Sequence, residues 1–163
     1  MLKQKFSQIQ QALLREAKAY YGQRLVSLVF FGSVARGTQT FTSDLDVLII
    51  CDRLPRGRIN RVREFDRIET ALEPMLEQIE QQGFHVRLSP IFKTPDEALK
   101  GSPLFLDMVE DAEIYFDRNN FFTNLLQKMR LRLKALGARR IWRGNAWYWD
   151  LKPDFKPGEV FEI

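Results

Sequence analysis

The chain opens with a pattern in which apolar residues recur every three or four positions, the spacing of one face of a helix. These residues are Phe6, Ile9, Leu13, Ala17 and Tyr20. Gly22 follows them, and glycine often ends a helix because it adopts positive φ without strain. The pattern predicts an N-terminal amphipathic helix that ends near Gly22.

Two continuous apolar runs follow, each with the length of a buried strand. Residues 25 to 31 read LVSLVFF and end at Gly32, and residues 44 to 51 read DLDVLIIC. The segment between them is rich in Gly, Thr and Ser, which is typical of a loop. We therefore expect two strands joined by a polar loop.

A longer helical pattern extends from Arg58 to Gln82 and is closed by Gly83. Its apolar positions are Ile59, Val62, Phe65, Ile68, Leu72, Met75 and Ile79. Pro74 lies inside this pattern, and proline removes a backbone hydrogen bond from a helix interior. We expect one long helix with a kink or a break near Glu73.

A third strand and a short helix are predicted next. Residues 84 to 92, FHVRLSPIF, have the composition of a strand, and Pro90 indicates that it frays there or lies at the edge of the sheet. Thr94 and Glu97 have the spacing of a capping box, which opens a helix by reciprocal hydrogen bonds.

The end of the chain combines a strand, a helix and an aromatic tail. Residues 113 to 116, EIYF, form a short strand candidate, and a helical pattern then extends from Phe122 to Gly137. The tail, residues 138 to 163, contains three tryptophans, a neighbouring tyrosine and two prolines. We expect it to be extended, with its rings packed on the domain or a partner rather than on nucleic-acid bases.

These elements predict one α/β (α+β) unit, in which a small sheet is flanked by helices. We assign residues 1–117 to the core. Residues 118–163 would form a C-terminal helix and extended tail that pack on this core or on a partner.

Composition places the chain among ordinary globular proteins. It has 163 residues, of which 45% are hydrophobic and 28% charged, enough for one domain with a true core. No apolar run approaches the roughly 20 residues that cross a bilayer. Cys51 is the only cysteine, so no internal disulfide can form, and we expect a cytoplasmic protein without membrane contact.

The charge is unevenly distributed around a net value of +4. Residues 107 to 117 contain five acids and no base, whereas residues 128 to 143 contain seven bases and no acid. Such a basic segment suits nucleic acid, a triphosphate or an acidic protein partner, and it is equally typical of a solvated helix face.

The candidate chemistry begins with Asp44 and Asp46. Side chains two residues apart on a strand share a face, so both carboxylates would point the same way at the start of an apolar strand. There they repel each other and lose hydration unless a cation joins them. Oxygen ligands of this kind suit Mg²⁺ or Mn²⁺, which take their other ligands from water and phosphates.

The turn before this strand adds a second signal. Gly32 directly follows a buried strand, and Ser33 is suited to cap a short helical turn whose N–H groups bind phosphate oxygens. Arg36 could add a positive charge for a phosphate, and Gly37 would supply a positive φ.

The spacing of these residues resembles a known signature. Gly32-Ser33, ten intervening residues and Asp44-Leu45-Asp46 resemble the motif of the DNA polymerase beta-like nucleotidyltransferase superfamily. The fuller string GSVARG followed by SDLD, in so short a chain, resembles the minimal nucleotidyltransferases. Many of these are antitoxins encoded beside a HEPN-domain ribonuclease. The motif covers residues 32 to 46, and the order of elements extends the similarity to about residue 117.

The resemblance implies a nucleotidyltransferase fold with a small mixed sheet. It also implies that Asp44 and Asp46 are catalytic metal ligands for Mg²⁺ or Mn²⁺, and that Gly32 and Ser33 hold the triphosphate of ATP or another NTP. Ser43, which directly precedes the acid pair, joins the candidate nucleotide-binding residues.

In that superfamily a third carboxylate on a later strand completes the site. On the strand 84–92, alternation leaves only His85, Arg87 and Ser89 on the functional face. Arg87 stands where we expect the acid, so it would pair with Asp46 or contact a phosphate, unless the register is off by one residue. We interpret His85 and Cys51 as structural residues.

Two functions follow from these observations. The first is Mg²⁺-dependent transfer of a nucleoside monophosphate, AMP by preference, to a hydroxyl on a cognate HEPN-type toxin. The second is a catalytically degenerate module that neutralises its partner by stoichiometric contact, which Arg87 at the expected place of the third acid favours. An antibiotic-modifying transferase and a nucleic-acid polymerase rank lower, because so short a chain has little room for the additional domains they need. The sequence leaves the oligomeric state open.

Overall fold

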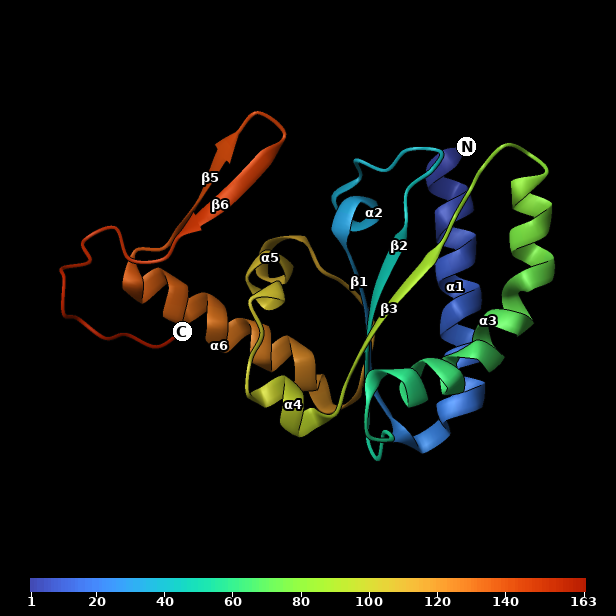
Figure 1. Ribbon diagram of the computed structural model, residues 1–163, viewed down its shortest axis with the longest axis horizontal. Helices are drawn as coiled ribbons and strands as arrows, with labels where there is room; N and C mark the ends of the chain where they lie inside the picture. Colours follow the sequence, from blue (N-terminus) through green and yellow to red (C-terminus); the bar gives the residue numbers. More distant parts are fainter.

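A four-stranded mixed sheet lies at the centre of the protein, with strands in the order β3-β2-β1-β4 (Figure 1). The structure is a computed structural model that describes every residue from 1 to 163. β1 (Leu25–Phe31) is antiparallel to β2 (Leu45–Cys51) and to β4 (Glu113–Asp117), and β2 is parallel to β3 (Leu88–Lys93). The predicted mixed α/β class is confirmed.

Helices cover both faces of this sheet and make three layers (Figure 1). On one side lie α1 (Leu2–Tyr21) and α3 (Arg58–Glu80). On the other side lie α4 (Pro95–Leu99), α5 (Leu104–Asp111) and α6 (Phe121–Leu136). Three short helical turns connect these elements: η1 (Gly22–Arg24), α2 (Gly32–Arg36) and η2 (Arg118–Asn120). None of the helices is long and apolar enough to cross a membrane.

The two faces of the sheet belong to two separate hydrophobic cores. Leu45, Val47 and Ile49 pack with residues of α1 and α3, whereas Leu48 and Ile50 pack with residues of α5 and α6. Because both faces are covered, β2 is apolar at nearly every position instead of alternating. Asp46 is the exception, so it stands out as a polar residue in a buried strand.

The third strand is shorter than we expected. It begins at Leu88 rather than at residue 84, although Phe84 is buried as predicted. Residues 84–87 lie outside β3 and form backbone hydrogen bonds with the loop before β2 and with the first residue of β2. The His85 N–H donates to the Phe41 carbonyl, and the Leu45 N–H donates to the Arg87 carbonyl. β3 is an edge strand, which explains why it tolerates a proline that cannot donate a ladder hydrogen bond.

α3 is bent, and the proline inside it does not end the helix (Figure 1). The helix is continuous through Pro74 and changes direction along its length (Figure 1). The kink alternative is therefore the observed one. The capping box of α4 is also present, with Thr94 and Glu97 exchanging side chain to backbone hydrogen bonds.

The prediction of an extended tail is wrong for residues 139–150, because these residues form a hairpin. β5 (Arg139–Arg143) and β6 (Ala146–Asp150) pair in a separate two-stranded antiparallel sheet that projects beside the core (Figure 1). The two residues between them are Gly144 and Asn145, and Gly144 has a φ of 62°. A two-residue loop with a glycine at positive φ is a common hairpin turn, and this signal is visible in the sequence.

Candidate functional site

A tight turn links the buried strand β1 to the acid pair. α2 begins at Gly32 immediately after β1, and no side chain caps its first N–H groups. Gly32 has a φ of 74°, a region that residues with a Cβ rarely adopt. Gly37 ends the turn in the left-handed conformation, with a φ of 72°, as the sequence predicted. The turn therefore leaves free N–H donors at the end of β1.

Gly32 lies directly against the carboxylate of Asp46. A Cβ added to Gly32 would overlap the Asp46 Oδ2 atom, so any other residue would force this carboxylate to move. Asp46 pairs with Phe31 in the antiparallel register of β1 and β2, which fixes the carboxylate beside the turn. The glycine-serine turn and the aspartate thus form one local structure.

The environment of Asp46 disfavours its charged form. The residue is half-buried, and this burial is the main reason that its pKa is raised above the usual value for an aspartate. A hydrogen bond from Ser89 and the charge of Arg36 act in the opposite direction, while the charge of Asp44 raises the pKa further. A cation bound between the two carboxylates would reverse this penalty.

Asp44 lies just before β2 and is exposed to solvent. Its influence on the Asp46 pKa indicates that the two carboxylates are close to each other. Ser43, another candidate nucleotide ligand, has a structural contact in the loop: its Oγ accepts a hydrogen bond of 2.8 Å from the Thr40 N–H. The structure therefore brings Gly32, Asp44 and Asp46 together and gives Ser43 a role in shaping the loop.

Ser89 and not Arg87 stands opposite Asp46 in the parallel pair of β2 and β3. Our placement of Arg87 at that position is wrong, because β3 begins at Leu88 and the register differs by two residues. Arg87 is exposed and contributes its carbonyl to Leu45. The strand brings no third carboxylate, and no group of three metal-binding side chains occurs in the chain. Sequence alternation had placed Ser89 on the functional face together with Arg87, but it could not tell which of the two pairs with Asp46.

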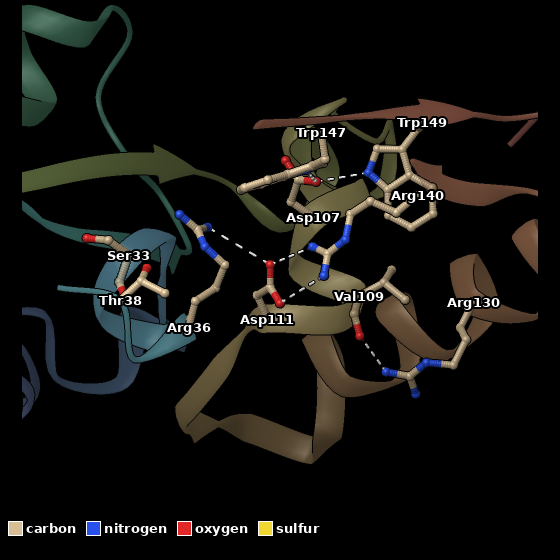
Figure 2. A network of polar contacts seen from close by, with 10 residues as sticks. All are labelled: Ser33, Arg36, Thr38, Asp107, Val109, Asp111, Arg130, Arg140, Trp147 and Trp149. Atoms are coloured by element: carbon tan, nitrogen blue, oxygen red, sulfur yellow. Dashed lines mark hydrogen bonds and ion pairs between the residues drawn. The ribbon is translucent and has the colours of Figure 1, made fainter. Parts of the chain in front are cut away.

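Arg36 points from the end of α2 toward the C-terminal hairpin (Figure 2). Its Nη1 lies 3.9 Å from Asp111 Oδ2, and its guanidinium lies over the indole of Trp147, 4.7 Å from the ring centroid. Arg36 therefore contacts α5 and the hairpin, and its charge also lowers the pKa of Asp46.

The hairpin is anchored to α5 by tryptophans and an ion pair (Figure 2). The Nε1 atoms of Trp147 and Trp149 both donate to Asp107 Oδ1, at 2.7 and 2.9 Å. Arg140 donates to both oxygens of Asp111, at 2.7 and 3.5 Å. The acidic segment, residues 107–117, and the basic segment, residues 128–143, are therefore in contact in the fold through Asp111 and Arg140.

The remaining candidates lie away from this site. His85 is exposed and bonds Glu80 at 2.9 Å, and Cys51 is fully buried, which raises the pKa of its thiol to about 12. A cavity of about 910 Å³ lies between α4, α6 and the end of the chain. None of the predicted site residues lines this cavity, so it does not mark the same site.

The donor set fits a divalent cation. Asp44 and Asp46 offer carboxylate oxygens next to a backbone turn, and Gly32 leaves the space that the Asp46 carboxylate occupies. Mg²⁺ needs only one or two carboxylates when phosphates and water supply its other ligands. These two aspartates could hold such an ion, and no third acid is available to hold a second one in the same way.

Comparisons with known proteins identify the family of the chain. Residues 11–116 match the family model described as a nucleotidyltransferase domain. A Methanocaldococcus jannaschii protein, whose name describes it provisionally as a protein adenylyltransferase, is 35% identical over 125 residues. That similarity covers 76% of this chain and 80% of the relative.

Two solved structures are more distant. One is a toxin–antitoxin complex with AMP-PNP, 18% identical, with a TM-score of 0.48 over 77% of this chain and 90% of the other. The second is a Shewanella oneidensis HEPN toxin, tri-AMPylated, in complex with its MNT antitoxin; it is 15% identical, with a TM-score of 0.41 over 83% and 91%. Neither similarity is needed for the assignment, because the family match and the 35% identical relative cover most of the chain. On those two findings, the chain belongs to the nucleotidyltransferase domain family.

Proposed function

We propose that this nucleotidyltransferase transfers AMP from ATP to a hydroxyl group of a protein, with Asp44 and Asp46 as the ligands of an essential Mg²⁺. The observation that carries the proposal is the half-buried Asp46, which lies against Gly32 beside free backbone donors and whose pKa is raised by its burial. The relative described as a protein adenylyltransferase supports the choice of AMP and of a protein acceptor.

The residues of the chain would divide the reaction as follows. The first N–H groups of α2, with Ser33, would bind the triphosphate, and Asp44 and Asp46 would hold the cation. The cation would supply charge neutralisation for the phosphates and orientation of the attacking hydroxyl. The hydroxyl oxygen forms a bond to the α-phosphorus, the bond to the bridging oxygen breaks, pyrophosphate leaves, and the hydroxyl proton passes to solvent. Arg36 would add a positive charge near the phosphates.

We further propose a cytoplasmic HEPN-domain toxin as the acceptor, with a tyrosine hydroxyl as its reactive group. The motif GSVARG followed by SDLD, which resembles minimal nucleotidyltransferases that act as antitoxins, supports this acceptor. Transfer of AMP would then inactivate the toxin.

Label transfer tests the proposal. The chain is incubated with labelled ATP, Mg²⁺ and the product of a neighbouring HEPN gene, and label on that product is measured. We expect transfer that depends on Mg²⁺ and is abolished by Asp44→Ala and by Asp46→Ala. Transfer that survives both substitutions, or label that stays on ATP in the presence of a folded partner, contradicts the proposal.

A second candidate function is a binding module that neutralises its partner by contact alone. Ser89 favours it, because this residue stands opposite Asp46 at the place where a third carboxylate would complete the acid set. Under that function, Asp44→Ala and Asp46→Ala would leave neutralisation of the toxin unchanged. Growth of cells that express the toxin with each variant separates the two functions.

A further inference from the structure

The C-terminal hairpin lies outside the residues that match the nucleotidyltransferase family, yet it touches the candidate site. The family match ends at residue 116, whereas β5 and β6 span Arg139–Arg143 and Ala146–Asp150. Trp147, in β6, is the point at which the hairpin meets α2, through the guanidinium of Arg36 (Figure 2).

Arg36 is held on two sides. Its guanidinium lies over the Trp147 ring and at 3.9 Å from Asp111, and its side chain is only 22% exposed. Asp111 is itself bound more closely by Arg140, at 2.7 Å, so it attracts Arg36 without forming a short hydrogen bond to it. An arginine in this state keeps its orientation and still has donors for another anion.

The Trp147 ring is in turn fixed from behind. Its Nε1 donates to Asp107 at 2.7 Å, and the neighbouring Trp149 donates to the same oxygen. Arg140 also lies near the ring, 5.2 Å from its centroid. These contacts hold the indole in one place, so Trp147 offers Arg36 a rigid surface.

We propose that the hairpin completes the nucleotide site: Trp147 is a positioning residue that holds the side chain of Arg36, the last residue of α2, in an orientation from which Arg36 contacts the triphosphate. The proposal rests on the proposed function of the site. Its physical basis is conformational entropy, because a long arginine side chain that is already oriented loses less freedom when a phosphate binds. The cation–π contact supplies that orientation without using the donors.

The test compares the affinity of variants for ATP with Mg²⁺, measured by calorimetry, and KM with kcat for AMP transfer. We expect Trp147→Ala to weaken binding and raise KM by about fivefold to tenfold with kcat unchanged, since a positioning contact affects ground and transition state alike. Trp147→Phe, which keeps an aromatic face, should restore affinity to within about threefold. Tyr148→Ala, the matched control on the same strand, should stay within about twofold, because Tyr148 contacts Arg143 and not Arg36.

A double-mutant cycle separates positioning from general damage to the fold. Arg36→Ala should weaken binding at least as much as Trp147→Ala, and adding Trp147→Ala to Arg36→Ala should cost less than about twofold more. Additive losses in the double variant overturn the proposal, and so does an unchanged affinity in Trp147→Ala. A wild-type chain that binds no ATP with Mg²⁺ overturns the proposed function as well, whereas normal wild-type binding with an unaffected Trp147→Ala variant overturns only the role of the hairpin.

Discussion

Two partly buried carboxylates, at opposite ends of the β2–β3 pair, have opposite electrostatic environments. Glu97, in the helix that follows β3, accepts two hydrogen bonds of 2.8 Å from Arg61 and one of 2.9 Å from the Thr94 N–H. The bond with Arg61 is the main reason that its pKa falls to about 2. Asp46, at the start of β2, has a raised pKa because burial outweighs its hydrogen bond with Ser89.

The difference distinguishes a carboxylate that stabilises the fold from one that is left for a ligand. The charged form of Glu97 is satisfied by partners from its own chain. The charged form of Asp46 lacks comparable partners and lies beside free backbone donors, which is the arrangement expected where a cation binds. Substitutions at these two ends should therefore affect activity and stability in opposite ways.

The largest expected effect is on catalysis. We predict that Asp46→Ala and Asp44→Ala each lower the rate of AMP transfer by roughly a thousandfold, because the cation that stabilises the transition state loses a ligand. The measurement is the initial rate of label transfer at saturating ATP. Glu97→Ala is the matched control and should keep a rate within about threefold of wild type. An equal loss of rate in the Glu97 and Asp46 variants would contradict the view that only Asp46 serves a ligand.

The next largest effect concerns Gly32, which joins the turn to Asp46. Gly32→Ala should destabilise the fold by about 2 to 4 kcal/mol, since it adds strain at positive φ and a clash with the Asp46 carboxylate. Gly22→Ala is the control, because Gly22 also has positive φ but has nothing near its missing Cβ. Denaturant unfolding of both variants isolates the clash; an equal loss in the two variants would mean that Asp46 does not crowd Gly32.

A smaller effect on stability is expected from Glu97→Gln. With the lowered pKa, ionised Glu97 stabilises the fold above its unfolded pKa, and this contribution is lost as the pH falls toward about 2. We predict a loss of about 1 to 2 kcal/mol at pH 7, allowing for the partial exposure of the carboxylate. The difference from wild type should shrink between pH 5 and pH 3 in urea unfolding. A difference that is constant over this range contradicts the role of the charge.

The smallest effect has the opposite sign. Since the pKa of Asp46 is raised, its ionisation costs folding stability as the pH rises through the range between the unfolded and folded pKa values. Asp46→Asn should therefore stabilise the chain by about 0.5 to 1 kcal/mol at pH 7 with a chelator present. The gain should shrink as the pH falls through about 4 and vanish near about pH 3, where the carboxyl is protonated in both states. A variant that is less stable than wild type at pH 7 would show that the charged form is already satisfied.

The sequence predicted the elements whose signals are local. Periodicity placed α1, α3 and α6, and the spacing of Thr94 and Glu97 placed the cap of α4, because these patterns depend on near neighbours along the chain. The sequence placed Gly32 directly after one apolar strand and Asp46 in the next, but the contact between them is seen only in the fold.

The parts that the sequence missed depend on register and on distant contacts. Arg87 was placed opposite Asp46, but an irregular segment before β3 shifts the pairing to Ser89. The approach of Trp147 to Arg36 joins residues more than a hundred positions apart, and no local pattern contains it. The Gly144-Asn145 turn is a local signal of a hairpin, but the two prolines that follow it favour an extended tail, which is what the sequence predicted.

The central claim is that Asp46 holds a cation that binds the triphosphate. The most direct test is the affinity for a non-hydrolysable ATP analogue, measured by calorimetry in three conditions: wild type with Mg²⁺, wild type with a chelator, and Asp46→Asn with Mg²⁺. We predict clear binding in the first condition and affinities at least about tenfold weaker in the other two, because the carboxylate and the cation bind the triphosphate together. Equal affinity in all three conditions would contradict the assignment of Asp46 to a cation site.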